Sequence, residues 1–332
     1  MRDSLGDKMQ KNNPFPWSDS NKRYYTYDYY LKKRFGSKCC KIILDGGFTC
    51  PNRDGTIAHT GCIFCSPMGS GDFCADRRLT ITEQFHIIRE RLQKKWPGAV
   101  YLAYFQAYSN TYAPLEILKE KYEEALAQPG VVGINIATRA DCIEDRVLTY
   151  FCELSQETAL TIELGLQSVH DETLKRIRRG HDFECFLRTY TKLKGAGIDV
   201  CIHIINGLPG ETEAMMLKTA EKLADLQPHS VKFHMLNVLK GTALAETYLK
   251  EPFPLLTRDA YVNIVCRQLE RLPSATVIGR VCGDAGADSV IAPYWTRKKF
   301  VVMNEIDKWF VQHASMQGRL YQTDANGART SC

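Results

Sequence analysis

Residues 41–65 read KIILDGGFTCPNRDGTIAHTGCIFC and lead from a short apolar strand, 42–44, into a loop with three cysteines. Cys50, Cys62 and Cys65 are separated by eleven and then two residues. Two cysteines three positions apart can bring both sulfurs to one metal centre. A third cysteine at the start of the loop completes a three-thiolate site.

The sequence leaves the fourth ligand of this site open. Structural zinc sites and electron-transfer iron–sulfur clusters take four protein ligands, and His59 within the loop could be the fourth. In α/β barrels, in contrast, chemistry takes place in the loops at the carboxyl ends of the strands. Three thiolates on a cubane would leave one iron open for that chemistry. The position of the loop therefore favours a catalytic cluster over a structural metal.

Strand-like and helix-like runs alternate along the chain. The expected strands are 42–44, 100–105, 131–137, 159–164, 200–205 and 231–236. Helical spacing of apolar residues predicts helices over 82–95, 115–127, 145–154, 183–193 and 213–226. Such alternation gives parallel strands with right-handed crossovers. The fold class is therefore α/β, a partial (β/α)6 TIM-like barrel with ligands at the carboxyl ends of its strands.

Three segments are expected along the chain: an N-terminal arm over 1–38, a barrel core over 39–272 and a small C-terminal extension over 273–332. Within the extension, residues 276–280 could add one more strand, and 297–311 read as a helix. The tail, 317–332, is expected to be weakly ordered.

Composition excludes several classes of protein. The chain has 332 residues with 43 Lys+Arg against 38 Asp+Glu, near the average for globular domains. It has no apolar run long enough to span a bilayer, and its polar first residues do not read as a signal peptide. We therefore expect a cytoplasmic protein without membrane association. In a reducing compartment its 13 cysteines are expected to be ligands, catalytic thiols or core residues rather than disulfides.

The positive charge is concentrated in the arm. Residues 1–38 hold nine Lys or Arg and four Asp, which equals the net charge of +5 of the whole chain. The arm also holds five tyrosines, at positions 24, 25, 27, 29 and 30. Basic groups interleaved with aromatic rings suit a phosphate backbone and unpaired bases. The alternative is an arm that packs its tyrosines onto the barrel and leaves its lysines solvated.

The other cysteines divide by position. Cys39 and Cys40 precede the first expected strand, and Cys74 and Cys282 could approach the mouth of the barrel. Those at 142, 152, 185, 201 and 266 lie in expected helices or strands and are interpreted as small core residues.

The motifs GGFTCPNRDG at 46–55 and GCIFC at 61–65 resemble those of the radical S-adenosylmethionine (SAM) enzymes. Within them the chain is similar to the YhcC/YtqA family, which is related to the catalytic subunit of elongator. Most of the superfamily uses Cys-x3-Cys-x2-Cys, whereas the eleven-residue first gap fits this branch. The resemblance spans residues 21–313, most of the chain.

The resemblance implies that the three cysteines hold a [4Fe–4S] cluster whose open iron binds SAM. Gln106 and Ala107 stand where the superfamily has glycines that hold the methionine amino group, and this is a departure from its pattern. Arg179 would meet the carboxylate of SAM. The SAM-binding residues implied by the resemblance are Gln106, Ala107, Ser109, Arg139, Glu163, Gln167, Arg179, His203, Ile205 and Leu236.

Glu163 also stands out without the resemblance. It lies on a strand that is otherwise apolar, so its carboxylate needs a partner or a ligand. Two readings remain: an acceptor for the ribose hydroxyls of SAM, which the resemblance implies, or a structural ion-pair partner of an arginine.

The chemistry implied by the resemblance is reductive cleavage of SAM to a deoxyadenosyl radical, which takes a hydrogen from the substrate. A one-electron donor such as flavodoxin or ferredoxin is implied as a partner. The implied substrate is tRNA, whose wobble-uridine side chain would change from carboxymethylaminomethyl to aminomethyl. Acetyl transfer is not carried over from elongator, because no room for an acetyltransferase domain is expected. Alternatives are a radical SAM enzyme acting on a protein or small metabolite, and a non-catalytic protein with a structural metal.

Overall fold

The computed structural model describes residues 13–283, 286 and 288–322. Seven parallel strands form one sheet in the order β1-β2-β3-β4-β5-β6-β8. The strands are β1 (Cys39–Leu44), β2 (Val100–Phe105), β3 (Val131–Thr138), β4 (Ala159–Gln167), β5 (Asp199–Asn206), β6 (Ser230–Met235) and β8 (Val277–Arg280). All six expected strands are present. The possible extra strand near residue 276 is confirmed as β8.

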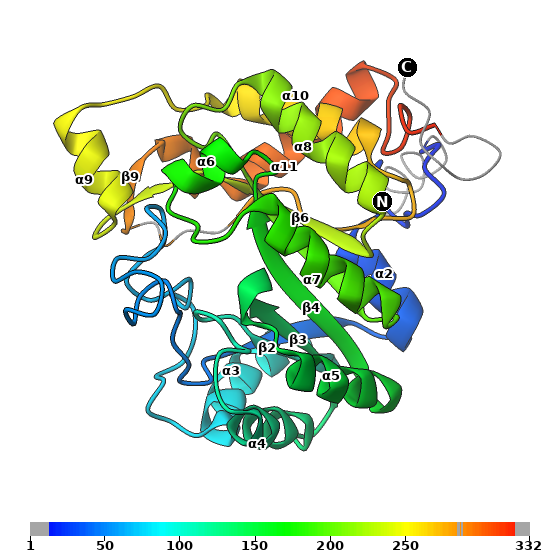
Figure 1. Ribbon diagram of the computed structural model, residues 1–332. Helices are drawn as coiled ribbons and strands as arrows, with labels where there is room; N and C mark the ends of the chain where they lie inside the picture. The colour runs from blue at the N-terminus through cyan, green and yellow to red at the C-terminus, as the bar shows by residue number, and fades with distance from the viewer. Residues whose placement is uncertain (1–12, 284–285, 287, 323–332) are drawn as a thin grey trace.

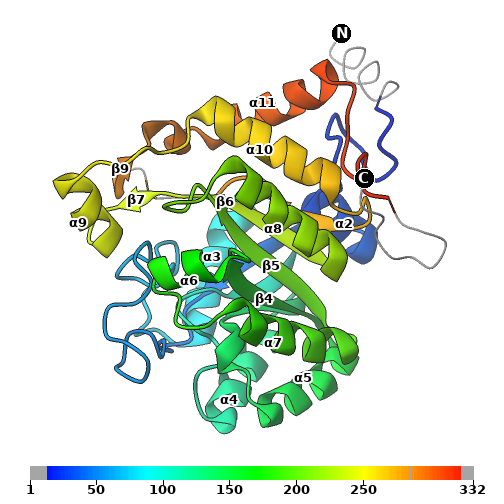
Figure 2. The same ribbon diagram turned by 45° about the horizontal axis from the view of Figure 1, so that its top comes forward.

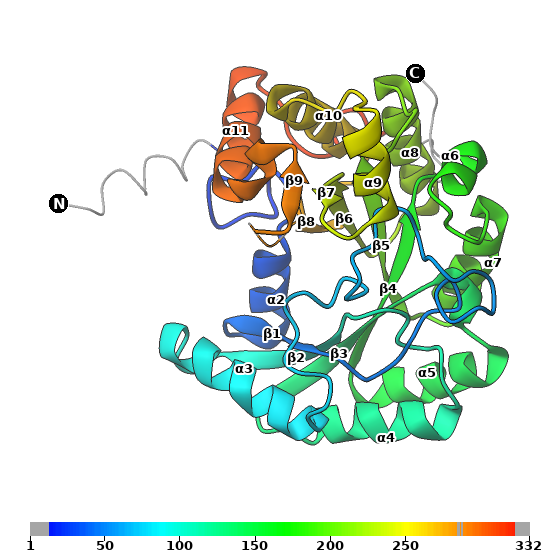
Figure 3. The same cartoon turned by 90° about the vertical axis from the view of Figure 1, so that its left-hand side faces the viewer.

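The sheet curls into a half-barrel with helices on its convex side (Figure 1). Those between successive strands are α3 (Ile81–Lys95), α4 (Leu115–Leu126), η1 (Ala140–Cys142), α5 (Asp145–Glu157), α6 (Asp171–Arg176), α7 (Phe183–Gly195) and α8 (Glu213–Leu226). Alternate strand residues face this helical layer, as Ile162 and Leu164 of β4 do in the main core. Glu163, between them, points to the concave side and lines a cavity there. Figure 3 shows the loop between β1 and α3 in front of that concave side.

The C-terminal part of the chain adds a second helical layer beside β6 and β8 (Figure 2). It contains α9 (Ala243–Lys250), α10 (Arg258–Arg271), η2 (Tyr294–Arg297) and α11 (Lys299–Gln312), and a small antiparallel pair, β7 (Val238–Leu239) with β9 (Val290–Ala292). The expected helix near 297–311 is therefore confirmed, whereas α9 and α10 were not expected. None of the described helices is both long enough and apolar enough to cross a bilayer.

Two expectations about local structure are wrong, one at the first strand and one at the start of the C-terminal tail. Cys39 and Cys40 lie inside β1 rather than before it. Gln317 belongs to the tail expected to be weakly ordered, yet it is fully buried. Its amide nitrogen donates to the carbonyl oxygens of Pro273 and Thr276, at 2.6 and 2.8 Å. Residues 323–332 of that tail, with Cys332, lie outside the described residues.

The N-terminal arm closes the open edge of the half-barrel. Its helix α2 (Tyr27–Phe35) lies between the two outermost strands, β1 and β8, and Thr26 forms a parallel bridge with Ile278.

Tyr24 of the arm is buried in the main core. Lys22 and Arg34 pair with Asp307 and Asp199. The described part of the arm thus follows the packing alternative at these positions, while Tyr29 is half-buried and Lys33 is exposed.

The twelve cysteines in the described part of the chain are all free thiols, as expected. Cys142, Cys201, Cys266 and Cys282 are buried. Cys282 belongs to the main core rather than to the mouth of the barrel. Cys74 is half-buried, and its burial raises the pKa of the thiol to about 12.

Candidate active site

The loop after β1 is held in shape by hydrogen bonds. The backbone N–H of Cys65 donates to the carbonyl oxygen of Cys62 at 3.0 Å, which closes a turn between the two cysteines. The Arg53 guanidinium donates to the carbonyl oxygens of Cys65 and Ser66 at 2.9 and 2.7 Å. Gly61 gives the guanidinium room, because a Cβ there would lie 2.8 Å from Arg53 Nε. The loop is therefore built around the Arg53 guanidinium.

The three predicted ligands meet at one cavity. Cys50, Cys62 and Cys65 all line a space of about 170 Å³ at the carboxyl ends of the strands. The Cys62 sulfur accepts N–H groups from Asn52 at 3.5 Å and Arg179 at 3.9 Å. Burial raises the pKa of Cys65 to about 11. A bound metal centre would hold that sulfur deprotonated.

The spacing of the sulfurs indicates what they hold. Among the described residues, one set of three metal-ligating side chains has its ligand atoms within 4.8 Å of one another, and it consists of Glu163, Cys201 and His203. At least one pair of the loop sulfurs therefore lies more than 4.8 Å apart. In a four-iron cluster each cysteine binds a different iron, so the wider spacing fits the expected cluster.

His59 does not complete this site. Its side chain is exposed and lies against Gly55, where a Cβ would be 2.6 Å from His59 Cε1. It neither lines the cavity nor joins the cysteines in a group of close ligand atoms. The structural-metal interpretation with His59 as fourth ligand is therefore not supported.

The cavity also collects most of the predicted SAM-binding residues. Those that line it are Gln106, Ser109, Arg139, Glu163, Gln167, Arg179 and His203. Ile205 and Leu236 line an adjoining cavity of about 190 Å³, which shares Gln106, Gln167 and His203 with the first. Ala107 is the exception. It is buried, and a Cβ on Gly71 would lie 2.8 Å from its methyl group, so it supports the wall from behind.

Several cavity-lining polar atoms are buried without a partner among the described residues: Ser109 Oγ, Arg139 Nη1, Gln167 Oε1 and Arg179 Nε. An unpaired buried polar atom costs about 1–3 kcal/mol, so their convergence is typical of a site that holds a polar ligand. The backbone at Gln167 is also strained. Its φ is +79°, and the β4–β5 register shifts between Gly165 and Gln167.

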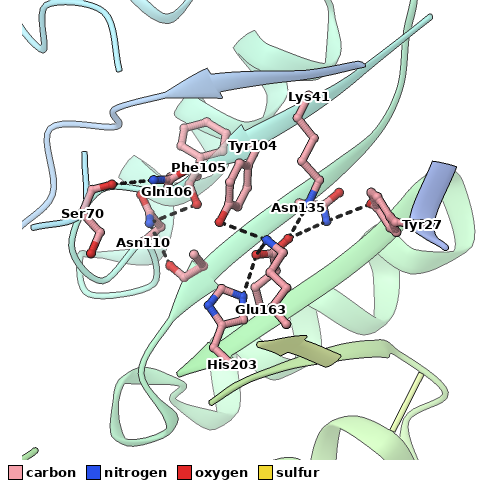
Figure 4. Close-up of polar contacts among 12 residues, drawn as sticks. Tyr27, Lys41, Ser70, Tyr104, Phe105, Gln106, Asn110, Asn135, Glu163 and His203 are labelled. Atoms are coloured by element: carbon pink, nitrogen blue, oxygen red, sulfur yellow. Dashed lines mark hydrogen bonds and ion pairs between the residues drawn. The ribbon is translucent and has the colours of Figure 1, made fainter. Parts of the chain in front are cut away.

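Glu163 is the centre of a buried charge network (Figure 4). One carboxylate oxygen accepts from Lys41 Nζ at 2.6 Å and Asn135 Nδ2 at 2.9 Å. The other accepts from His203 Nε2 at 2.9 Å and from the Lys232 ammonium. Burial opposes the charge on Glu163, but Lys232 and Lys41 outweigh it and hold its pKa well below the usual range.

This network bears on the two readings of Glu163. The structural partners are lysines from β1 and β6 rather than an arginine, and both carboxylate oxygens are occupied. The ribose-binding role of Glu163 therefore stays a prediction, one that requires the ribose to share an oxygen with these partners. A metal ion at Glu163, Cys201 and His203 is disfavoured, because two ammonium groups already flank the carboxylate.

Sequence reasoning missed four residues of this interior: Lys41, Tyr104, Asn135 and Lys232. Each lies on a strand between apolar neighbours, as Glu163 does. A charged residue in an otherwise apolar strand is a usable signal, because a buried charge has to be paired. Applied to Lys41 and Lys232, that signal would have found both partners.

Two family descriptions match the chain. Residues 50–223 match the radical SAM superfamily, and residues 228–312 match the radical SAM C-terminal domain. The YtqA protein of Bacillus subtilis (strain 168) is 48% identical over 314 residues, 95% of this chain and 98% of that protein. YhcC of Escherichia coli (strain K12) is 36% identical over 284 residues, 85% of this chain and 91% of that protein.

More distant similarity reaches enzymes named for tRNA. The tRNA uridine(34) acetyltransferase of Methanocaldococcus infernus is 27% identical over 163 residues, 48% of this chain and 30% of that protein. A solved structure of Elp3 from the same archaeon superposes with a TM-score of 0.63 at 19% identity. It covers 85% of this chain and 64% of that one. At this identity the superposition shows the shared half-barrel fold.

Proposed function

The chain belongs to the radical SAM superfamily, and we propose that it uses radical chemistry to convert the wobble-uridine side chain of tRNA from carboxymethylaminomethyl to aminomethyl. The observation that carries this proposal is the similarity of nearly half the chain to a tRNA uridine(34) acetyltransferase. That similarity spans 30% of the acetyltransferase, so the acetyl-transfer activity is not part of the proposal.

Enzymes of this superfamily bind a [4Fe–4S] cluster and SAM, which together supply hydrogen-abstracting radical chemistry. Cys50, Cys62 and Cys65 are the residues that fit the cluster. Arg139, Gln167 and the other unpaired polar atoms would orient SAM, and Ile205 and Leu236 would contact its adenine. The barrel walls would exclude water from the reactive species. A one-electron donor such as flavodoxin or ferredoxin is the implied partner, and a tRNA substrate implies a cytoplasmic reaction.

Two experiments test this function at separate levels. Anaerobically reconstituted, reduced protein should release deoxyadenosine from SAM, and a protein that releases none would contradict the enzyme class. Cys185→Ala, which changes a partly exposed thiol on α7, is the matched control for changes in the cysteine loop.

Nucleoside analysis of bulk tRNA from a deletion strain tests the substrate. We expect carboxymethylaminomethyluridine to accumulate at the wobble position and aminomethyluridine to disappear. Unchanged wobble uridines would contradict the tRNA substrate and favour a protein or small metabolite, while leaving the radical SAM chemistry untouched.

A further inference from the structure

The concave side of the barrel carries more positive than negative charge. Lys41, Lys232 and Arg280 face one carboxylate, Glu163, in this interior. His203 and His234 do not offset this positive charge. Burial lowers the pKa of both imidazoles, that of His203 to about 4. Among the described residues that line the first cavity, Glu163 is the one acidic side chain, and Asp72 lines the adjoining cavity. An excess of buried cationic groups is costly unless an anion joins them.

Lys232 lies at the centre of this excess. Its side chain is 5% exposed, and its ammonium group lies 3.4 Å from Tyr104 Oη, on a strand of the opposite half of the sheet. Gly279 of β8 makes room for it, because a Cβ there would lie 2.8 Å from Lys232 Cγ. Burial, the first cause, lowers the pKa of Lys232 to about 7 against the attraction of Glu163. The Glu163 carboxylate thus does not fully neutralise the Lys232 ammonium group.

Arg280 and His234 stand next to this lysine. Arg280 pairs with Lys232 across β6 and β8 and lines both parts of the cavity. No hydrogen bond or ion pair joins its guanidinium to any of the residues that the structure describes. His234 is two residues after Lys232 on the same face of β6, and its Nε2 is buried without a partner in the described chain. Three donors therefore converge on one wall of the cavity.

We propose that Lys232, Arg280 and His234 form a subsite for a substrate carboxylate in the barrel interior. The inference rests on the proposed function, since the group it would hold is the carboxymethyl end of the uridine side chain. A planar carboxylate suits a guanidinium fork with a neighbouring ammonium.

Chain geometry favours a carboxylate over a backbone phosphate. A carboxylate at the end of a side chain has one connection to the substrate, so it can enter a cavity of this size end-on. A phosphodiester continues into a nucleoside on both sides, and both nucleosides would have to enter as well. The shared chemistry is an oxyanion, and the test below distinguishes the two sources.

The test compares two tRNAs that differ at one group. Purified tRNA with carboxymethylaminomethyluridine and tRNA with aminomethyluridine are titrated anaerobically against the enzyme with its cluster and SAM bound. Wild-type enzyme should bind the carboxylate-bearing tRNA about 10-fold or more tightly than the other. Arg280→Gln should lose roughly 10- to 100-fold in affinity for that tRNA alone, as loss of a hydrogen bond to a charged group implies. Arg280→Lys, which keeps the charge, should lose less.

Arg146→Gln is the matched control, because Arg146 pairs with Glu144 at the surface beside α5 and should leave both affinities unchanged. Unchanged thermal melting of Arg280→Gln and Arg280→Lys establishes that the variants fold. If Arg280→Gln does not fold, two measurements still test the subsite: the preference of wild-type enzyme between the two tRNAs, and the reduction of that preference in Arg280→Lys.

Three outcomes would overturn the subsite: equal binding of the two tRNAs by wild type, no binding of either, or an Arg280→Gln variant with wild-type preference. An equal loss for both tRNAs would assign Arg280 to a backbone phosphate and also overturn it. If wild-type enzyme converts the tRNA without an Arg280-dependent preference, the subsite fails and the proposed function stands. If it does not convert the tRNA, both fail.

Discussion

Lys41 of β1 and Glu163 of β4 lie three strands apart in the sheet, yet their side chains meet at 2.6 Å. In a flat sheet three strand spacings amount to about 14 Å, and a lysine and a glutamate that point straight out from the same face could not bridge that distance. The contact therefore depends on the curl of the sheet. The contact between Lys232 of β6 and Tyr104 of β2, four strands apart, depends on it too.

Glu163→Gln should destabilise the folded protein strongly. The amide keeps the size of the side chain but leaves Lys41 and Lys232 without their shared carboxylate, in an interior where the Glu163 side chain is fully buried. Breaking a buried ion pair by removing one partner costs about 3–5 kcal/mol. Urea denaturation under anaerobic conditions measures the loss.

Glu172→Gln is the control for that experiment, since Glu172 pairs with Lys175 at the surface, where both side chains are about three-quarters exposed. We expect no measurable change in the free energy of unfolding for this variant. If Glu163→Gln unfolds at the same urea concentration as Glu172→Gln, the buried network does not hold the barrel together.

The stability of the protein should depend on pH through Lys232. Burial, reinforced by Lys41 and only partly offset by Glu163, lowers the pKa of Lys232 to about 7 from 10.5. Between these values the unfolded chain binds a proton that the folded chain does not. The free energy of unfolding should therefore rise with pH in this window, by up to about 1.4 kcal/mol per pH unit.

Lys232→Met removes that contribution, so the measurement is the difference between wild type and variant in urea denaturation at about pH 7 and about pH 8.5. The titratable groups that face Lys232 are common to both proteins: Lys41, Tyr104, Glu163, Cys201, His203, His234 and Arg280. Identical pH dependence in wild type and variant would show that Lys232 is charged throughout this range.

The order of strands and most of the outer helices could be predicted because local patterns specify them. The helix expected near residue 82 begins at Ile81, capped by Thr80 and Glu83 as its sequence suggests. The cysteine loop could also be predicted, because the spacing of Cys50, Cys62 and Cys65 is itself the signal. Both features depend on residues close together in the chain.

The partners of Glu163 could not be predicted, because they depend on curvature. Periodicity identifies which residues point inward, but how far the sheet bends decides which inward residues meet. The same limit applies to the arm, since Tyr24 reaches the core through an edge that exists once β1 and β8 are placed. The helix α10 was missed for a different reason: it buries Gln268 and Glu270, so its polar residues obscured its period.

Gly133→Ala should test how closely β3 and β4 pack. A Cβ at Gly133 would lie 2.5 Å from the backbone carbonyl oxygen of Ala159, which cannot move without shifting β4. We expect the free energy of unfolding to fall by about 1–3 kcal/mol, as for other overpacked sites.

Gly195→Ala is the opposite case. Its Cβ would meet nothing within 4 Å at the end of α7, and the variant should gain about 0.5–1 kcal/mol. Thermal or urea unfolding of the pair decides, and a neutral Gly133→Ala would contradict the tight strand contact.

Cys62→Ala should abolish cluster binding while leaving the fold intact. The Cys62 sulfur lines the cavity and accepts N–H groups from Asn52 and Arg179, but its side chain belongs to none of the hydrophobic clusters that hold the helices to the sheet. Iron and sulfide analysis after anaerobic reconstitution should therefore find the cluster lost. Urea denaturation of metal-free wild type and variant should differ by less than about 1.5 kcal/mol, the range for removal of one small buried group. Cys185→Ala should bind iron like wild type. A Cys62→Ala protein that unfolds when metal-free wild type does not would mean that Cys62 supports the barrel itself.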